Sequence, residues 1–192
     1  MRKAAIIVEN RNLNGLDKTI QGHMDRLSDW DLIHYSDMIV NNGHDYNNIL
    51  ASPQFWEVDY DKVLIFQHDS MLLKNGADDF LDWDYVGSPW KASANWARHD
   101  RAGGNGGLSI RDVQAHRDLL KIKKYNPKYG NEDVFFTHHL PNVAPFDVCV
   151  RFACETEFKL GTIGYHQIEN YLSLSQQIQI KMQYEQAPKD TA

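Results

Sequence analysis

A short polar segment, Gln67-His68-Asp69, directly follows the apolar run Val63-Leu64-Ile65-Phe66. Four consecutive apolar residues are typical of a buried strand, and an α/β sheet holds its ligands at the carboxyl ends of its strands. Asp69 is therefore a candidate ligand for a hard cation such as Mg2+ or Mn2+, which prefers oxygen donors and can bridge the phosphates of a nucleotide. Taken alone, an Asp after a strand is more often a residue that caps a loop.

The segment Gly103-Gly104-Asn105-Gly106-Gly107 holds more glycine than an ordinary turn needs, and it precedes an apolar strand. No helix is predicted after it and the sequence has no GK[ST] motif, so it is neither a dinucleotide-binding GxGxxG nor a Walker loop. Two interpretations remain open. The backbone lies close to a flat ligand such as a sugar ring, or the segment is a flexible hairpin.

Glu132 and Asp133 form an acidic pair in the first turn of a predicted helix that Asn131 would cap. The helix macrodipole stabilises ionised carboxylates at that end and would keep a base available at neutral pH. Such a base suits the deprotonation of an acceptor hydroxyl. Acidic residues are also favoured at helix starts for stability alone, and without further context that explanation is preferred.

His166 ends the glycine-punctuated segment of residues 161–166, where a neutral imidazole could complete a metal site or contact a phosphate. A lone histidine is more often structural, and three others lie beside candidate residues: His68, His138 and His139. Three arginines could each hold a diphosphate through two hydrogen bonds: Arg11, Arg111 and Arg151. Of the three, only Arg11 lies at the end of a predicted strand.

The alternation of apolar runs and helical spacings predicts an α/β layered fold with a mostly parallel sheet. Strands are predicted at residues 4–8, 30–35, 63–66, 85–87, 106–110 and 148–152. Helices are predicted at 16–27, at 53–56 after a Ser52 cap, at 111–122 and from 132 onward. Residues 92–105 are predicted to form a loop. The tail from about residue 173 stays unassigned, because its pattern fits a strand, a helix or a loose end.

The chain has 192 residues, of which 42% are hydrophobic, and residues 1–192 fit one domain with one sizeable core. Its net charge of -6 argues against a broad surface for nucleic acid or anionic membrane. No apolar run is long enough to span a bilayer and Glu9 interrupts the first one, so a cytoplasmic location is expected. Cys149 and Cys154 lie an odd number of residues apart in a predicted strand, which places them on opposite faces and argues against a disulfide.

Six segments, in this order, resemble the DUF5672 family of glycosyltransferase-like domains: VLIFQHDSMLL, FLDWDYVGSPW, GNGGLSIRD, NEDVFF, FACETEF and GTIGYHQ. The resemblance covers roughly residues 4 to 172, and the order of the motifs is more specific than any single motif. It implies a GT-A-like, Rossmann-like fold with a mixed, mostly parallel sheet flanked by helices. Such a domain binds a nucleoside diphosphate sugar in its first half and an acceptor in its second half.

The same resemblance implies where the donor and its metal ion bind. The nucleobase is expected near the end of the first strand, at Glu9, Asn10 and Arg11. The DxD signature that holds Mn2+ or Mg2+ maps onto Gln67-His68-Asp69, and His166 resembles the late histidine that completes the metal site. Because Gln67 replaces the first Asp of this signature, Asp69 must provide most of the metal binding.

The resemblance also implies roles for the remaining candidates. Gly106-Gly107 resembles the glycine-rich strand that borders the donor sugar, and Glu132-Asp133 resembles the acidic pair from which inverting members draw their base. If the enzyme retains configuration at the sugar carbon, it requires no such base. Fold and chemistry outlast specificity in a family, so the resemblance does not identify the donor sugar or the acceptor.

The leading hypothesis is metal-assisted transfer of a sugar from a nucleoside diphosphate sugar, uridine-linked, to a hydroxyl acceptor. Asp69 and His166 would hold the ion, with Asp133 or Glu132 as the base. One alternative is a glycoside hydrolase that uses Asp69 and Glu132 as paired carboxylates, which requires a separation of about 5 to 9.5 Å. Another is a non-catalytic nucleotide-sugar-binding module. The acceptor stays open between a small glycan, a protein, a lipid-linked sugar and a modified nucleobase in DNA.

Overall fold

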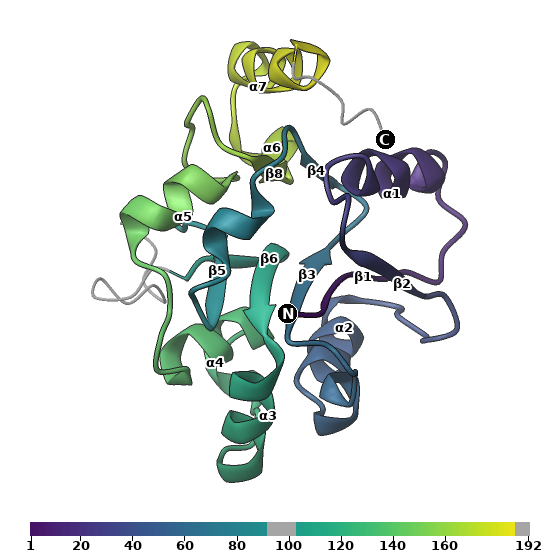
Figure 1. The fold of residues 1–192 in the computed structure, drawn as a ribbon, viewed down its shortest axis with the longest axis vertical. Helices are drawn as coiled ribbons and strands as arrows, with labels where there is room; N and C mark the ends of the chain where they lie inside the picture. Colours follow the sequence, from purple (N-terminus) through teal and green to yellow (C-terminus); the bar gives the residue numbers. More distant parts are fainter. Residues whose placement is uncertain (92–102, 187–192) are drawn as a thin grey trace.

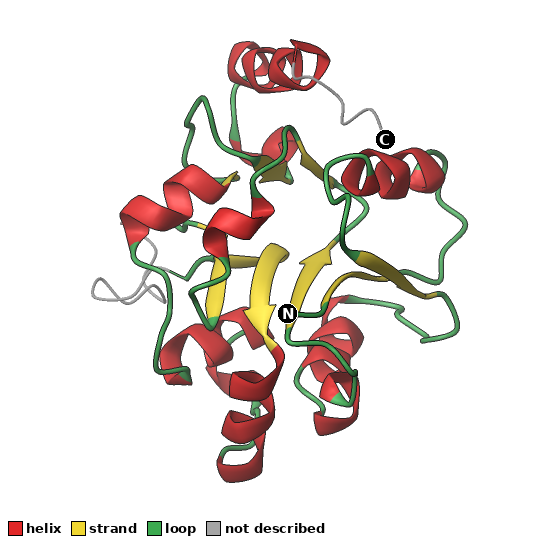
Figure 2. Cartoon of the chain, in the orientation of Figure 1, coloured by secondary structure: helices red, strands yellow, loops and turns green. Residues whose placement is uncertain are grey.

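The computed structural model describes residues 1–91 and 103–186 as a layered α/β structure (Figure 1; Figure 2). Its strands are β1 (Lys3–Val8), β2 (Asp31–Tyr35), β3 (Lys62–Phe66), β4 (Ser70–Leu72), β5 (Tyr85–Ser88), β6 (Asn105–Asp112), β7 (Ala153–Cys154) and β8 (Gly164–His166). Its α-helices are α1 (Leu16–Met24), α2 (Gly43–Leu50), α3 (Val113–Ile122), α4 (Glu132–His139), α5 (Phe146–Phe152), α6 (Ile168–Tyr171) and α7 (Leu174–Gln186). Short 3-10 turns lie at Pro53–Trp56, Ala77–Phe80 and Pro127–Tyr129.

The central sheet has the strand order β2-β1-β3-β6-β5. The pairs β1–β2 and β1–β3 are parallel, whereas β3–β6 and β6–β5 are antiparallel. Four strands therefore run in one direction and β6 runs against them. The sheet is mixed and mostly parallel, as predicted.

Alternating side chains of the central strands build one hydrophobic core on each face of the sheet. Ala5 and Ile7 of β1 face the core covered by α1 and α5. Ile6 and Val8 face the opposite core, which α2, α3 and α4 cover. Figure 1 shows these two groups of helices on either side of the sheet. Because both faces are covered, a ligand can reach the sheet at the carboxyl ends of its strands.

A second, smaller sheet has the order β4-β8-β7 and lies at those strand ends. Three residues separate the end of β3 from the start of β4, which pairs antiparallel with β8 so that Ser70 lies opposite His166. A third hydrophobic cluster joins this sheet to α6 and α7 through residues such as Cys154, Ile168 and Ile180. The small sheet thus brings the C-terminal part of the chain to the end of β3.

The strand predicted at residues 148–152 is wrong, because these residues belong to helix α5. Val148, Cys149 and Phe152 are its buried side chains, at a helical spacing. The apolar residues at 148, 150 and 152 gave the misleading alternation, while Pro145 stands at the N-cap. Cys149 and Cys154 are both free, as predicted, although one lies in a helix and the other in a strand.

Other predicted elements need smaller corrections. Arg111 belongs to β6, and α3 begins only after Asp112, whose side chain accepts from the backbone N of Ala115. Helix α2 was not predicted, although Asn42 caps it through the backbone N of His44 and Asp45. Of the unassigned tail, Leu174–Gln186 form helix α7, and residues 187–192 lie outside the described residues. Of the predicted loop at 92–105, residues 92–102 lie outside the described residues.

Within the described residues, none of the helices combines the length and the apolar character that a bilayer span requires.

Candidate functional site

Two parallel strands of the central sheet end side by side and open a cavity of about 240 Å³. Glu9 and Arg11 follow β1, and Gln67, His68 and Asp69 follow β3. The first turn of α2 and the segment before it form the opposite wall, together with Tyr46. The cavity therefore gathers five of the predicted donor-binding residues at the carboxyl ends of β1 and β3.

Glu9 and Arg11 form one hydrogen-bonded unit at this cavity. The Nε and Nη2 atoms of Arg11 donate to the two carboxylate oxygens of Glu9 at 2.8 and 2.6 Å. This hydrogen bonding, aided by the Arg11 charge, holds the pKa of Glu9 below its ordinary value despite burial. Glu9 is buried, whereas the Arg11 side chain is 53% exposed. Arg11 is therefore held at the mouth of the cavity with part of its guanidinium facing outward.

Asn10 is turned to the neighbouring loop. Its Oδ1 accepts a hydrogen bond from the backbone N of Val40 at 3.2 Å. Val40 itself lines the cavity, so Asn10 supports the wall that Val40 contributes. His68 lies between the two strand ends, with Nδ1 at 3.5 Å from Oε2 of Glu9.

Gln67, Asp69 and His166 meet where the two sheets join. Nε2 of His166 lies 2.9 Å from Oε1 of Gln67 and 3.4 Å from Oδ1 of Asp69. The pairing of β4 with β8 sets this contact, and the backbone N of Gln167 adds a hydrogen bond to the carbonyl O of Asp69 at 3.0 Å. The structure thus brings the predicted histidine to the predicted DxD position.

The charges of Asp69 and His166 depend on each other. Burial disfavours the imidazolium, yet the nearby carboxylates of Asp69 and Glu155 outweigh it and raise the pKa of His166 to about 9. Burial also opposes the Asp69 carboxylate, but His166 lowers the pKa of Asp69 to about 2. Without another cation, His166 therefore carries the positive charge that balances Asp69.

These three side chains fit a small divalent cation by their chemistry and spacing. Adjacent donors of an octahedral ion with bonds near 2.1 Å lie about 3 Å apart, and the two distances at His166 Nε2 are close to that value. The Oδ1 atom of Asp69 is buried without a hydrogen-bond partner among the described residues. Across residues 1–91 and 103–186, no three His, Cys, Asp or Glu side chains are grouped to hold a metal. The third protein donor would therefore be the neutral amide oxygen of Gln67.

Gly106 and Gly107 allow side chains of the site to lie against β6. A Cβ atom at Gly107 would stand 2.1 Å from Nε2 of His166. A Cβ atom at Gly106 would stand 2.6 Å from Oε1 of Glu132 and 2.6 Å from Nη2 of Arg111. The backbone of β6 thus lies close to His166 and to a buried ion pair, and glycine at both positions leaves room for them.

Glu132 is held in a buried ion pair with Arg111. Nη1 and Nη2 of Arg111 donate to the two carboxylate oxygens of Glu132 at 2.6 and 3.0 Å. Arg111 and Glu132 are 0% and 2% exposed. Arg111 is therefore engaged by Glu132 instead of being available to a diphosphate, and Arg151 lies on α5 away from this strand edge.

Asp133 is also buried, but its surroundings favour the protonated form. Burial and the neighbouring Glu132 charge raise the pKa of Asp133 to about 7, against hydrogen bonds that its carboxylate accepts from the backbone N of Gly106 and of Val134. Asp133 is therefore partly protonated and partly ionised near neutral pH, whereas the helix dipole alone would favour the ionised form. Asn131 stands at the N-cap without a capping hydrogen bond, because its Oδ1 accepts from Nδ2 of Asn47.

Two further residues of the site have no counterpart in the sequence predictions. Tyr46 of α2 lines the cavity, and its buried hydroxyl has no hydrogen-bond partner among the described residues. Glu155 follows β7 and faces Nδ1 of His166 at 3.5 Å. Glu155 could have been predicted from the sequence, because it is an acidic residue that directly follows the apolar run of residues 152–154. Tyr46 lies in a polar segment, and nothing in that segment predicts a binding residue.

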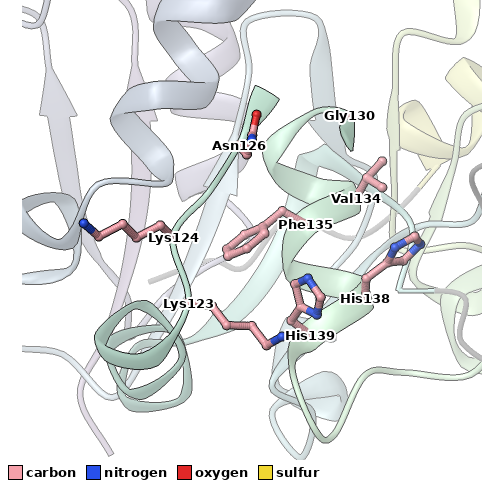
Figure 3. Close-up of a pocket in the computed structure, with 8 residues that line it drawn as sticks. All are labelled: Lys123, Lys124, Asn126, Gly130, Val134, Phe135, His138 and His139. Atoms are coloured by element: carbon pink, nitrogen blue, oxygen red, sulfur yellow. The ribbon is translucent and has the colours of Figure 1, made fainter. Parts of the chain in front are cut away.

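A second cavity, of about 470 Å³, lies between the C-terminal ends of α3 and α4 (Figure 3). Its lining includes Lys123, Lys124, His138 and His139. In Figure 3, Lys124 and His138 extend to opposite sides of Phe135 and do not converge on one point. Positive charge is favoured at helix C-termini by the macrodipole, which accounts for these residues. His138 and His139 therefore lie away from the cluster of Gln67, Asp69 and His166.

Solved structures share this fold at low sequence identity. Galactosyltransferase LgtC in complex with donor and acceptor sugar analogs superposes with a TM-score of 0.53 at 9% identity, over 99% of this chain and 97% of that chain. A glycosyltransferase involved in the glycosylation of the major capsid of PBCV-1 gives 0.49 at 8% identity, over 95% and 99%. The apo-form glycosyltransferase GlyE of Streptococcus pneumoniae TIGR4 gives 0.49 at 10% identity, over 100% and 66%.

The match to galactosyltransferase LgtC shows a GT-A-like fold with strands and helices in the arrangement described above. No curated protein sequence matches the chain. Residues 29–168 match the profile of the family described as "Protein of unknown function (DUF5672)". The match begins just before β2 and ends just after β8, so it contains Gln67, Asp69, Asp133 and His166. The chain is therefore a member of the DUF5672 family with a GT-A-like fold.

Proposed function

We propose that this protein, acting as one glycosyltransferase domain over residues 1–192, transfers a sugar from a nucleoside diphosphate sugar to a hydroxyl acceptor. The observation that carries the proposal is the meeting of Gln67, Asp69 and His166 beside a cavity that Glu9 and Arg11 also line. Sugar donors of this class present a base, a diphosphate and a ring in succession. The cavity offers polar groups from β1 and β3 over which such a ligand can extend.

The binding roles follow from the position of each side chain. Arg11, whose side chain is about half exposed, would neutralise phosphate charge at the mouth of the cavity. The donors of Gln67, Asp69 and His166 would hold Mn2+ or Mg2+. When bound, such an ion stabilises the negative charge that develops on a departing diphosphate. The nucleotide is proposed to be uridine diphosphate, in keeping with the family resemblance.

Asp133 is the proposed base if the reaction inverts the sugar carbon. Its pKa of about 7 suits proton transfer near neutral pH, because a base with such a pKa is partly free and still basic enough to accept a proton. Glu132 does not share this role, since Arg111 binds both of its oxygens. The acceptor class remains a hydroxyl of a glycan, a protein or a modified nucleobase in DNA.

The same ion pair weighs against a glycoside hydrolase built on Asp69 and Glu132. That mechanism needs one carboxyl group to exchange a proton with the glycosidic oxygen. Glu132 is buried, and both of its carboxylate oxygens accept charge-assisted hydrogen bonds from Arg111. Its carboxylate is therefore not free to exchange a proton with a substrate. The non-catalytic binding module is the remaining alternative, because Gln67 supplies a neutral donor where a second carboxylate would hold the ion.

The test is binding of nucleoside diphosphates, measured by titration calorimetry and by the rise in melting temperature with Mn2+ and with chelator. We expect uridine diphosphate to bind with Mn2+ and to lose affinity with chelator or in Asp69→Ala. The exposed carboxylate of Asp82 provides the control, so Asp82→Ala should behave like the parent protein. Binding that ignores chelator would support the non-catalytic module. Absence of binding by every nucleoside diphosphate would refute the proposed donor class.

A further inference from the structure

Glu155 faces the ring nitrogen of His166 that the proposed metal site does not use. Oε2 of Glu155 lies 3.5 Å from Nδ1 of His166, and the two side chains are 2% and 3% exposed. Neither atom has a hydrogen-bond partner elsewhere among the described residues. The carboxylate and the imidazole are therefore each other's polar partner in a buried position.

The backbone of the small sheet brings these two residues together. β7 pairs parallel with β8, with Ala153 opposite Gly164 and Cys154 opposite Tyr165. Continuing this register by one residue places Glu155 beside His166. On its other side β8 pairs with β4, and this pairing places His166 opposite Ser70. Ser70 directly follows Asp69 in the sequence. His166 thus lies between the carboxylate of Glu155, which follows β7, and that of Asp69, which precedes β4.

A buried carboxylate is unfavourable unless a donor compensates it. Burial raises the pKa of Glu155, and the nearby imidazole of His166 acts against that rise. The surrounding cluster of Leu73, Cys154 and Ile168 is apolar. The imidazole of His166 is therefore the polar group that compensates the buried Glu155 carboxylate.

We propose that Glu155 is a positioning residue that accepts the Nδ1–H of His166 and fixes the imidazole so that Nε2 points at Gln67 and Asp69. A histidine that binds a metal through one nitrogen commonly donates the other N–H to a carboxylate, which sets the ring orientation and tautomer. The orientation is a property of the protein alone. Its use in holding a divalent cation rests on the proposed function.

The first experiment measures Mn2+ affinity by titration calorimetry in three variants. Glu155→Met keeps nearly the same volume but has no acceptor for the N–H, and we expect Mn2+ to bind it about 10- to 100-fold more weakly. Glu155→Gln retains an acceptor oxygen and should stay within about threefold of the parent, because its amide oxygen can take the same hydrogen bond. Glu157→Gln is the control, because it makes the same change at the nearest other acidic residue in the sequence, and it should leave Mn2+ affinity unchanged. Equal affinity in Glu155→Met and the parent would overturn the link to the metal.

The second experiment reads the imidazole directly, without metal, in protein labelled with 15N at histidine. The parent protein and Glu155→Gln should show a hydrogen-bonded Nδ1–H at His166 that is protected from exchange with water, and Glu155→Met should lose it. His166→Gln assigns the signal. If the parent fails to bind Mn2+, the metal part of the proposed function is refuted, while this spectrum still decides the role of Glu155. The same His166 signals in the parent and in Glu155→Met would overturn the positioning role itself.

Discussion

Neighbouring carboxylates in the first turn of α4 have opposite electrostatic surroundings. Arg111 binds both oxygens of Glu132, whereas Asp133 accepts its hydrogen bonds from backbone N–H groups and lies beside the Glu132 charge. The sequence predicts both acids at a helix start, but it does not show that only one of them has a cationic partner. That difference makes Asp133 the better candidate for proton transfer.

The raised pKa of Asp133 predicts a pH-dependent stability. The folded state binds this proton more tightly than the unfolded state, since the pKa rises from 3.8 to about 7. The contribution of this proton to the free energy of unfolding is therefore fully present below about pH 4. It is lost as pH rises through about 7, and the total loss is up to about 4 kcal/mol. Asp133→Asn should remove this loss. Urea unfolding of both proteins at about pH 5 and about pH 8 measures the difference.

Asp147→Asn serves as the matched control, because Asp147 is an exposed acid in the first turn of another helix, α5. Its pH dependence should follow that of the parent protein. If Asp133→Asn and the parent lose the same stability between the two pH values, burial does not favour the protonated form of Asp133, and its assignment as the base loses its electrostatic support.

We expect the Tyr46 hydroxyl to contribute to ligand binding but not to the stability of the fold. Its buried hydroxyl has no partner among the described residues and lines the cavity. Tyr46→Phe should leave the melting temperature unchanged or slightly higher, because no hydrogen bond of the fold is removed. Nucleotide affinity should fall by about 1 kcal/mol, the typical net value of one hydrogen bond. Melting curves and titration calorimetry with uridine diphosphate and Mn2+ measure the two effects.

The control for Tyr46 is Tyr60→Phe. The Tyr60 hydroxyl donates to Asp31 on the exposed surface, so its removal should not change nucleotide affinity. An unchanged affinity in Tyr46→Phe would exclude contact between the Tyr46 hydroxyl and the nucleotide.

At the scale of elements, the central strands β1 and β3 were predictable because their apolar runs are continuous and both of their faces are buried. The run at residues 148–152 shows where this fails. Its apolar residues fit both the strand and the helix period, and only the packing of Val148, Cys149 and Phe152 against the core decides for a helix. Helix α2 was missed because its sequence, GHDYNNIL, is mostly polar and opens with glycine.

We expect position 107, near the start of β6, to require glycine because His166 packs against its backbone. A Cβ atom in Gly107→Ala would meet Nε2 of His166 at 2.1 Å, so the imidazole must move away from Gln67 and Asp69. We expect Mn2+ affinity to fall by about 10-fold or more, by analogy with the loss of other groups that orient a metal ligand. Gly43→Ala is the control for Mn2+ binding without nucleotide, because Gly43 lines the cavity but no atom lies within 4 Å of an added Cβ atom there. Tight Mn2+ binding by Gly107→Ala would show that His166 is not a ligand.

At the scale of the whole molecule, the candidate site depends on contacts between segments that are far apart in the sequence. The order of motifs indicated that residues around 69, 107 and 166 belong together, and the structure brings them into contact. Sequence alone could not provide the pairing of β4 with β8, which sets the distance between Asp69 and His166. It also could not show that Arg111 is buried, because the guanidinium is identified as a partner of Glu132 only once α4 is packed against β6.

The buried unit of Gly106, Arg111 and Glu132 also constrains how this chain can change over evolutionary time. A side chain at Gly106 displaces the ion pair, and losing either charge leaves the other buried and unpaired, which costs about 3 to 5 kcal/mol. Each single replacement is therefore harmful, while replacing both charges together by apolar residues of similar volume can be tolerated. The three positions should thus be inherited as a block and covary among relatives, and a member that lacks one of them should lack the others.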